Sequence, residues 1–186
     1  KQIEIHKRID EILKSDASRA SSTDVKNLIS SNFDARQYFY SAADERLVEW
    51  LWSNGFLDLL KEAPEKSDSY GYRTPEISYL VRVAPKAPEM VAEIILDENL
   101  ATSEQKFRPE LIDQVLRICE NLPQPQLAQV IRKIHRQEWT RIMAPFNRWG
   151  FEYEKIFEVL KSANDYETLF LLAESVLSIR SKEEEK

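Results

Sequence analysis

Residues 75–96 read PEISYLVRVAPKAPEMVAEIIL, and residues 109–131 read PELIDQVLRICENLPQPQLAQVI. Both stretches open on Pro-Glu, and proline suits the first turn of a helix because no helical hydrogen bond is lost there. In each stretch an apolar segment leads to a further proline, and a second apolar segment follows it. Each stretch therefore predicts a helix, a proline-marked turn and a second helix.

The two stretches also match in register. Pro75 and Pro109 are 34 residues apart, and Pro88 returns as Pro123 after 35 residues. The sequence LVRVA that starts at Leu80 returns as VLRIC, and the later VAEII returns as LAQVI. Four matches in the same order predict an internal structural repeat. Because one helical hairpin cannot bury its apolar stripe alone, the repeat predicts that neighbouring hairpins stack.

The flanking segments extend the helical pattern. Residues 2–14 carry apolar residues at helical spacing, and a short helix is expected at about 23–31. Gly55 is expected to end a helix in the left-handed conformation. Asn164, with Glu167 three residues later, is expected to cap the last helix. Residues 64–74 lack apolar periodicity and predict a loop.

These patterns predict three parts of the chain. Residues 1–32 form N-terminal helices and a polar linker, residues 33–180 form a helical-repeat domain, and residues 181–186 form a frayed acidic tail. The composition agrees, since 42% of the 186 residues are apolar and 31% are charged. Only three glycines occur, which argues against a glycine-rich nucleotide loop and against an all-β fold. The predicted fold class is all-α, with stacked antiparallel helical hairpins in a short, α-solenoid-like array.

The paired helices expected at 75–84 with 88–96, and at 109–120 with 125–135, resemble an α-helical repeat domain of the HEAT or armadillo type. The unit of 34 to 36 residues is short for HEAT repeats and close to tetratricopeptide length, but the tetratricopeptide pattern does not occur in order. The resemblance implies a scaffold that binds proteins or peptides along a curved surface. It implies no catalytic residues.

The charge, the single cysteine and the first residue of the sequence indicate where the protein is expected to function. The formal net charge of −6 disfavours a general nucleic-acid binder. Cys119 lies between apolar neighbours and is expected in the core, and a lone cysteine suits a reducing compartment. No apolar run reaches the length of a membrane span. Because the sequence begins with Lys1 and not with methionine, we expect a fragment of a larger intracellular protein. The lone cysteine and the lack of a membrane span predict a cytoplasmic location.

The sequence contains no arrangement of residues that is typical of a catalytic site. His135 and Glu138 are three residues apart on an expected helix, but a zinc site needs three or four protein ligands. No nucleophile motif occurs. We therefore expect no enzyme, no cofactor and no metal site.

The aromatic residues provide the candidates for protein binding. Trp50 and Trp52 are two residues apart and point to different sides of a helix. Tyr70 and Tyr72 flank Gly71 in the expected loop. Exposed tryptophan and tyrosine contribute strongly to interfaces, and the alternative is that the N-terminal helix covers such rings. The main hypothesis is a non-enzymatic protein–protein interaction or scaffold domain, whose partner is another protein or another domain of the parent chain.

An alternative function rests on a basic segment. Residues 132–149 combine an excess of positive charge with Trp139, Phe146 and Trp149, a combination that can hold single-stranded nucleic acid or another polyanion. The competing explanation is an ordinary solvated helix face, which the acidic net charge favours. The candidate polyanion-binding residues are Arg132, Lys133, Arg136, Arg141 and Arg148.

Overall fold

The computed structural model describes residues 2–14, 21–30, 32–58, 75–97, 115–136 and 151–183. Across these ranges the regular structure is helical and no strand occurs, which confirms the all-α fold class. Residues 115–119 are helical as well. The elements are α1 (Gln2–Lys14), α2 (Ser22–Ser30), α3 (Phe33–Ala42), the 3-10 helix η2 (Glu45–Leu47), α4 (Val48–Ser53), α5 (Pro75–Val83), α6 (Pro88–Leu96), α8 (Gln126–Arg136), α10 (Phe151–Ser162) and α11 (Tyr166–Glu183).

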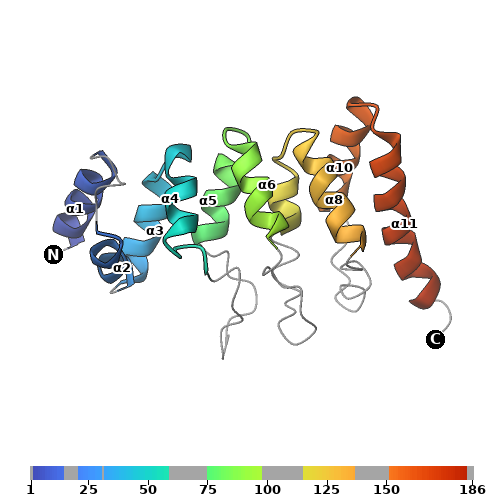
Figure 1. The fold of residues 1–186 in the computed structure, drawn as a ribbon. Coiled ribbons are helices and arrows are strands. Elements are labelled where there is room, and N and C mark those ends of the chain that lie inside the picture. The colour runs from blue at the N-terminus through green and yellow to red at the C-terminus, as the bar shows by residue number, and fades with distance from the viewer. Residues whose placement is uncertain are drawn as a thin grey trace.

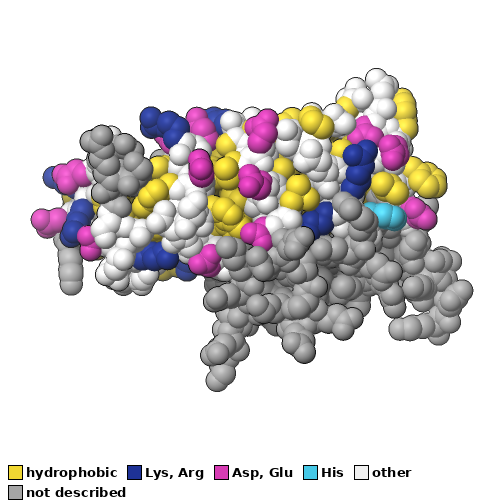
Figure 2. Space-filling view, in the orientation of Figure 1, with side chains coloured by type: hydrophobic (Ala, Val, Ile, Leu, Met, Phe, Trp, Pro, Cys, Tyr) yellow, Lys and Arg dark blue, Asp and Glu magenta, His cyan; other side chains and the backbone are white. Residues whose placement is uncertain are grey.

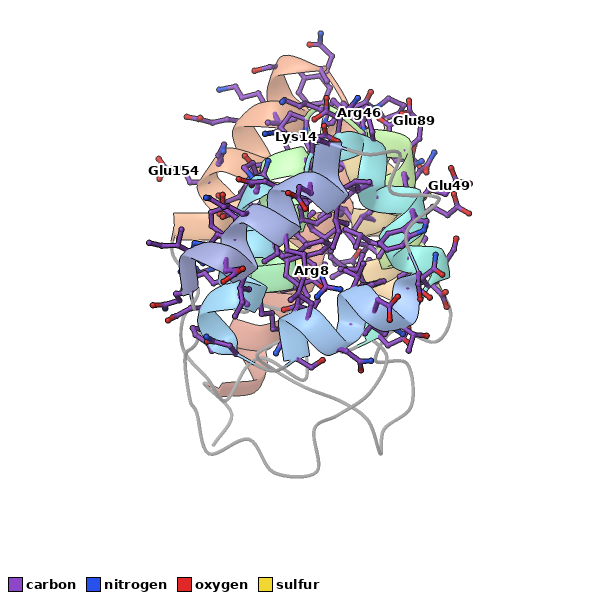
Figure 3. All side chains as sticks on the ribbon, turned by 90° about the vertical axis from the view of Figure 1, so that its left-hand side faces the viewer. Arg8, Lys14, Arg46, Glu49, Glu89 and Glu154 are labelled. Atoms are coloured by element: carbon purple, nitrogen blue, oxygen red, sulfur yellow. The ribbon has the colours of Figure 1, made fainter. Side chains whose placement is uncertain are left out.

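The helices follow one another in a row from α1 to α11 (Figure 1). Alternate helices lie side by side: α3 packs against α5, α4 against α6, and α6 against α8, which in turn contacts α11. Viewed along the row, Glu49 of α4 and Glu89 of α6 project from one side, and Glu154 of α10 projects from the opposite side (Figure 3). We call α4, α6 and α8, which face the viewer in Figure 1, the front row.

One cluster of buried apolar side chains runs through the row, from Ile9 of α1 to Leu172 of α11. Seven matched pairs of positions are buried in both stretches, and the matched pair Glu93 and Gln129 is exposed in both, although Val81 is only partly buried where its match Leu116 is buried. The match in sequence is therefore also a match in burial. The buried pairs are Leu80 and Val115, Val83 and Ile118, Ala84 and Cys119, Val91 and Leu127, Ala92 and Ala128, Ile94 and Val130, and Ile95 and Ile131.

The short turns lie along one edge of the row. Residues 84–87 join α5 to α6, residues 120–125 lead into α8, and residues 163–165 join α10 to α11, all at the upper edge of Figure 1. Pro88 is the first residue of α6, whereas Pro123 precedes α8, which begins at Gln126. The second turn is therefore longer than the first, although the helices that follow present matching core positions.

Replacing Ala92 or Ala128 by leucine is expected to lower the free energy of unfolding by about 1–3 kcal/mol, since extra methyl groups overpack a filled helix crossing. Both alanines are only 2% exposed, and α6 packs on α8. Urea denaturation of each variant measures the change, with leucine at the exposed Gln129 as the control. Unchanged stability in both alanine variants would contradict their equivalence.

Cations from neighbouring helices satisfy the last carbonyls of two helices. Arg82 of α5 donates to the carbonyls of Tyr40 and Ala43 at the end of α3. Lys133 of α8 donates to two carbonyls at the end of α6, that of Ile95 at 3.1 Å and that of Asp97 at 2.8 Å. The final carbonyls of a helix lack helical donors and form the negative end of its dipole. Charge as well as apolar packing thus holds neighbouring helices in register.

The N-terminal helices cover part of the aromatic run at 38–40. The side chains of Phe39 and Tyr40 are buried in the core. The ring of Tyr38 stacks on His6 of α1 with their centroids 4.0 Å apart, and its hydroxyl donates to Asp10 at 2.8 Å. The N-terminal helix α1 therefore covers one face of the Tyr38 ring, and the side chain is partly buried.

The predicted cap of the last helix is wrong by one residue. Asp165, and not Asn164, accepts the early helical amide, that of Thr168, at 3.2 Å. Asn164 has φ 56°, and its amide donates to the carbonyl of Lys161, so it ends α10 instead. Asparagine tolerates this left-handed conformation better than most residues. At the other predicted left-handed position, Gly55 has φ 71° just after Asn54, the residue that caps the end of α4, as expected.

Candidate functional site

A pocket of about 520 Å³ opens between the N-terminal helices and the start of α5. Three helices and the turn after α4 contribute to its wall, and both apolar and charged side chains line it. We call it the α2–α5 pocket. Its lining residues are Lys26, Ile29 and Ser30 of α2, Phe33, Arg36 and Tyr40 of α3, Gly55 and Phe56 of the turn, and Glu76 of α5.

Glu76 is the buried carboxylate of this pocket. The residue is 1% exposed, and its Oε1 accepts a hydrogen bond from Arg36 Nε at 2.6 Å. Its Oε2 is also buried and has no hydrogen-bond donor among the residues that the structure describes. Burying a charged oxygen without a donor is costly, so this atom is a strong acceptor that the described fold leaves unused.

Aromatic rings form one wall of the α2–α5 pocket. The hydroxyl of Tyr40 donates to the carbonyl of Phe56 at 2.8 Å, and it also lies near the carboxylate of Glu76. Burial, and then the nearby negative charge of Glu76, raise the pKa of Tyr40 far above its ordinary value. Tyr40 therefore stays neutral at physiological pH and acts as a fixed wall.

Two cations and an exposed ring complete the pocket. Phe33 is 59% exposed, although it is a large apolar residue. The ammonium of Lys26 lies 5.4 Å from the centroid of the Phe56 ring, and the Arg36 side chain is 37% exposed. Within the described ranges, neither Lys26 nor the terminal nitrogens of Arg36 take part in an ion pair. The pocket thus combines two cationic hydrogen-bond donors, Lys26 and Arg36, with the buried acceptor Glu76.

The front row presents a second surface of mixed character. Carboxylates surround apolar side chains over α4 and α6 (Figure 2). Glu49, Glu89 and Glu93 are exposed, while Trp52 and Met90 are partly buried and pack on the core. Among the described residues Glu49 and Glu93 have no ion-pair partner, and Glu89 accepts from Gln126 of α8 at 3.3 Å. We call these three glutamates with Trp52 and Met90 the front-row patch.

The predicted protein-binding residues have different surroundings. Trp50 is partly buried, and its ring lies 4.9 Å from that of Phe56 between centroids. Trp52 is partly buried and belongs to the front-row patch. Tyr70 and Tyr72 lie outside the described residues. The structure thus places Trp50 beside the pocket and Trp52 in the front-row patch.

The predicted polyanion-binding residues do not form one described surface. Lys133 is 8% exposed and caps α6, so its charge is used inside the fold. Nη2 of Arg132 lies 3.6 Å from Oε2 of Glu167 in α11, so these two residues form an ion pair. The side chain of Arg136 and all of Arg141 and Arg148 lie outside the description. Lys133 was predicted to be available for a polyanion, but its ammonium binds carbonyls at the end of α6 instead.

Single-stranded DNA or RNA is expected to bind no tighter than the weak, non-specific range, because the net charge is −6 and Lys133 is buried. Fluorescence anisotropy with a labelled oligonucleotide at low and high salt checks this. A salt-dependent complex of micromolar affinity, lost when Arg136 and Arg141 are reversed in charge, would contradict the expectation.

The described part of the chain contains no group of three or more His, Cys, Asp or Glu residues placed to hold a metal ion. Cys119 is fully buried, as expected, and burial raises its thiol pKa far above the ordinary value. None of the described helices has both the length and the apolar character required to cross a membrane.

Sequence reasoning did not identify Glu76 as a site residue. Glu76 and Glu89 both follow a proline at the start of a helix, yet Glu89 is exposed. Nothing in the local sequence distinguishes them, since the burial of Glu76 comes from α3, whose Arg36 is 40 residues away. By contrast, Glu89 and Glu93 are four residues apart beside an apolar stripe, a pattern that predicts an exposed acidic face.

Comparisons with protein-family models, curated proteins and solved structures found no match to this chain. The resemblance to HEAT or armadillo repeats therefore remains a prediction from sequence.

Proposed function

We propose that this chain is a non-enzymatic scaffold domain, a short α-solenoid-like array of stacked hairpins that binds a segment of another protein on its front row. The observation that carries the proposal is the front-row patch, in which exposed carboxylates that have no ion-pair partner among the described residues adjoin partly buried Trp52 and Met90. The packing of α4 on α6 and of α6 on α8 supports the proposed array, in which such a row of helices would form one continuous surface for a partner.

The chemistry of the patch favours a basic, partly apolar partner. Tryptophan and methionine offer apolar area that a partner can cover, and tryptophan is enriched among the residues that dominate binding energy. Glu49, Glu89 and Glu93 attract lysine and arginine, and the net charge of −6 steers such partners from a distance. An amphipathic basic helix matches both properties, with apolar side chains against Trp52 and Met90 and cations towards the glutamates.

A peptide-display experiment tests the proposal. A library of random peptides is selected on the immobilised protein and on a variant with Glu49→Gln, Glu89→Gln and Glu93→Gln. We expect peptides rich in lysine, arginine and apolar residues on the original protein, and at least tenfold weaker binding of those peptides to the variant, equivalent to about 1.4 kcal/mol.

A second variant separates the patch from the general effect of charge. Glu4→Gln, Glu11→Gln and Glu154→Gln remove the same charge from exposed positions on α1 and α10. The selected peptides should bind this control nearly as well as the original protein. Equal weakening by both variants, or selection of acidic peptides only, would contradict a front-row site.

A further inference from the structure

We propose that the α2–α5 pocket is a separate binding site for an acidic residue of a peptide. Lys26 and Arg36 bind the carboxylate of that residue, and Glu76 Oε2 accepts its backbone N–H. This inference does not depend on the front-row patch, because none of the patch residues lines the pocket.

The need for a donor comes from Glu76. The residue is 1% exposed, and Arg36 donates to Oε1, while Oε2 is buried and has no hydrogen-bond donor among the described residues. Tyr40 lines the same pocket, and its hydroxyl donates to the Phe56 carbonyl. A ligand that brings an N–H or O–H group to Oε2 would satisfy this acceptor.

The need for an anion comes from the two cations. Among the lining side chains, Lys26 and Arg36 outnumber the single carboxylate of Glu76, and the carboxylate of Asp58 lies beside Gly55 near Lys26. Arg36 uses Nε for Glu76, which leaves its terminal nitrogens for another acceptor. A lysine or arginine side chain could donate to Oε2 but would meet both cations, whereas a neutral N–H donor with a nearby carboxylate satisfies all three groups. A peptide residue with an acidic side chain carries both.

The size and walls of the pocket suit such a residue. A volume of about 520 Å³ lies in the range of small-ligand sites and holds one residue with its flanking peptide groups. Phe33 and Phe56 supply apolar wall on either side of the charged groups, and the 59% exposure of Phe33 leaves ring area for a ligand to cover. An acidic segment would therefore gain apolar contact together with its polar contacts.

Three blocked tripeptides test the proposal by NMR titration of the full chain, followed at the amide signals of residues 26–40. The first is acetyl-Gly-Glu-Gly-amide, the second has glutamine in place of glutamate, and the third has an ester oxygen in place of the glutamate N–H. We expect the first to bind and the other two to bind at least about tenfold more weakly, because each lacks one of the two recognised groups. Acetate alone should not reproduce the shifts.

Substitutions at exposed positions keep the fold intact and localise the site. Lys26→Met and Phe33→Ala should each weaken the glutamate peptide several-fold, whereas Lys7→Met, an exposed lysine of α1 outside the pocket, should leave binding unchanged. Equal binding of the three peptides would overturn the proposal, as would indifference to Lys26→Met or shifts confined to the front row. If the front-row patch bound no peptide, the expected binding of the glutamate tripeptide to the α2–α5 pocket would be unchanged.

Discussion

Replacing Arg36 by methionine is expected to lower the free energy of unfolding by about 3 kcal/mol, because it leaves the buried carboxylate of Glu76 without its partner. The value lies at the low end for buried pairs, since the Arg36 side chain is 37% exposed while that of Glu76 is 2% exposed. Chemical denaturation followed by circular dichroism measures the change.

Two further variants show whether burial causes the effect. Arg46 pairs with Asp44 at 2.6 Å, but its side chain is 80% exposed, so Arg46→Met should cost less than about 1 kcal/mol. Changing Arg36 and Glu76 together to methionine removes both charges and should recover much of the loss. If Arg36→Met and Arg46→Met had the same small effect, Glu76 would not be an isolated buried charge.

Replacing Lys133 by methionine is expected to lower the free energy of unfolding by about 2–3 kcal/mol, because two carbonyls at the end of α6 lose a charged donor. Methionine keeps much of the apolar stem, so the loss reports mainly on the ammonium group, which reaches Ile95 and Asp97. The same denaturation experiment measures it.

Lys161→Met is the matched control, since Lys161 is an exposed lysine near the end of α10. Its effect should stay within about 0.5 kcal/mol. A similarly small effect at Lys133 would show that its ammonium is not needed to hold α6 and α8 together.

Core positions could be predicted from the sequence because they depend on helical periodicity. Val91, Ala92, Ile94 and Ile95 repeat the spacing of later apolar residues, and both sets are buried. The Pro-Glu start at Pro75 and the left-handed Gly55 were also predictable, because local backbone chemistry decides them.

Roles set by tertiary contacts could not be predicted in the same way. Lys133 has the composition of a solvated basic face, but the end of α6 lies within reach of its ammonium and buries it. Glu76 resembles an ordinary first-turn glutamate until α3 brings Arg36 to it. At the last helix Asn164 and Asp165 are both good capping residues, and the left-handed end of α10 decides which of them caps α11.

Hydrogen–deuterium exchange, measured with and without a peptide from the display experiment, shows most directly whether the front row binds a partner. The proposed scaffold role predicts that the bound peptide protects amides of α4 and α6, which carry Glu49, Trp52, Met90 and Glu93, and leaves α10 unchanged. Protection confined to α10 and α11, with α4 and α6 unaffected, would contradict the proposal that the front row is the partner-binding surface.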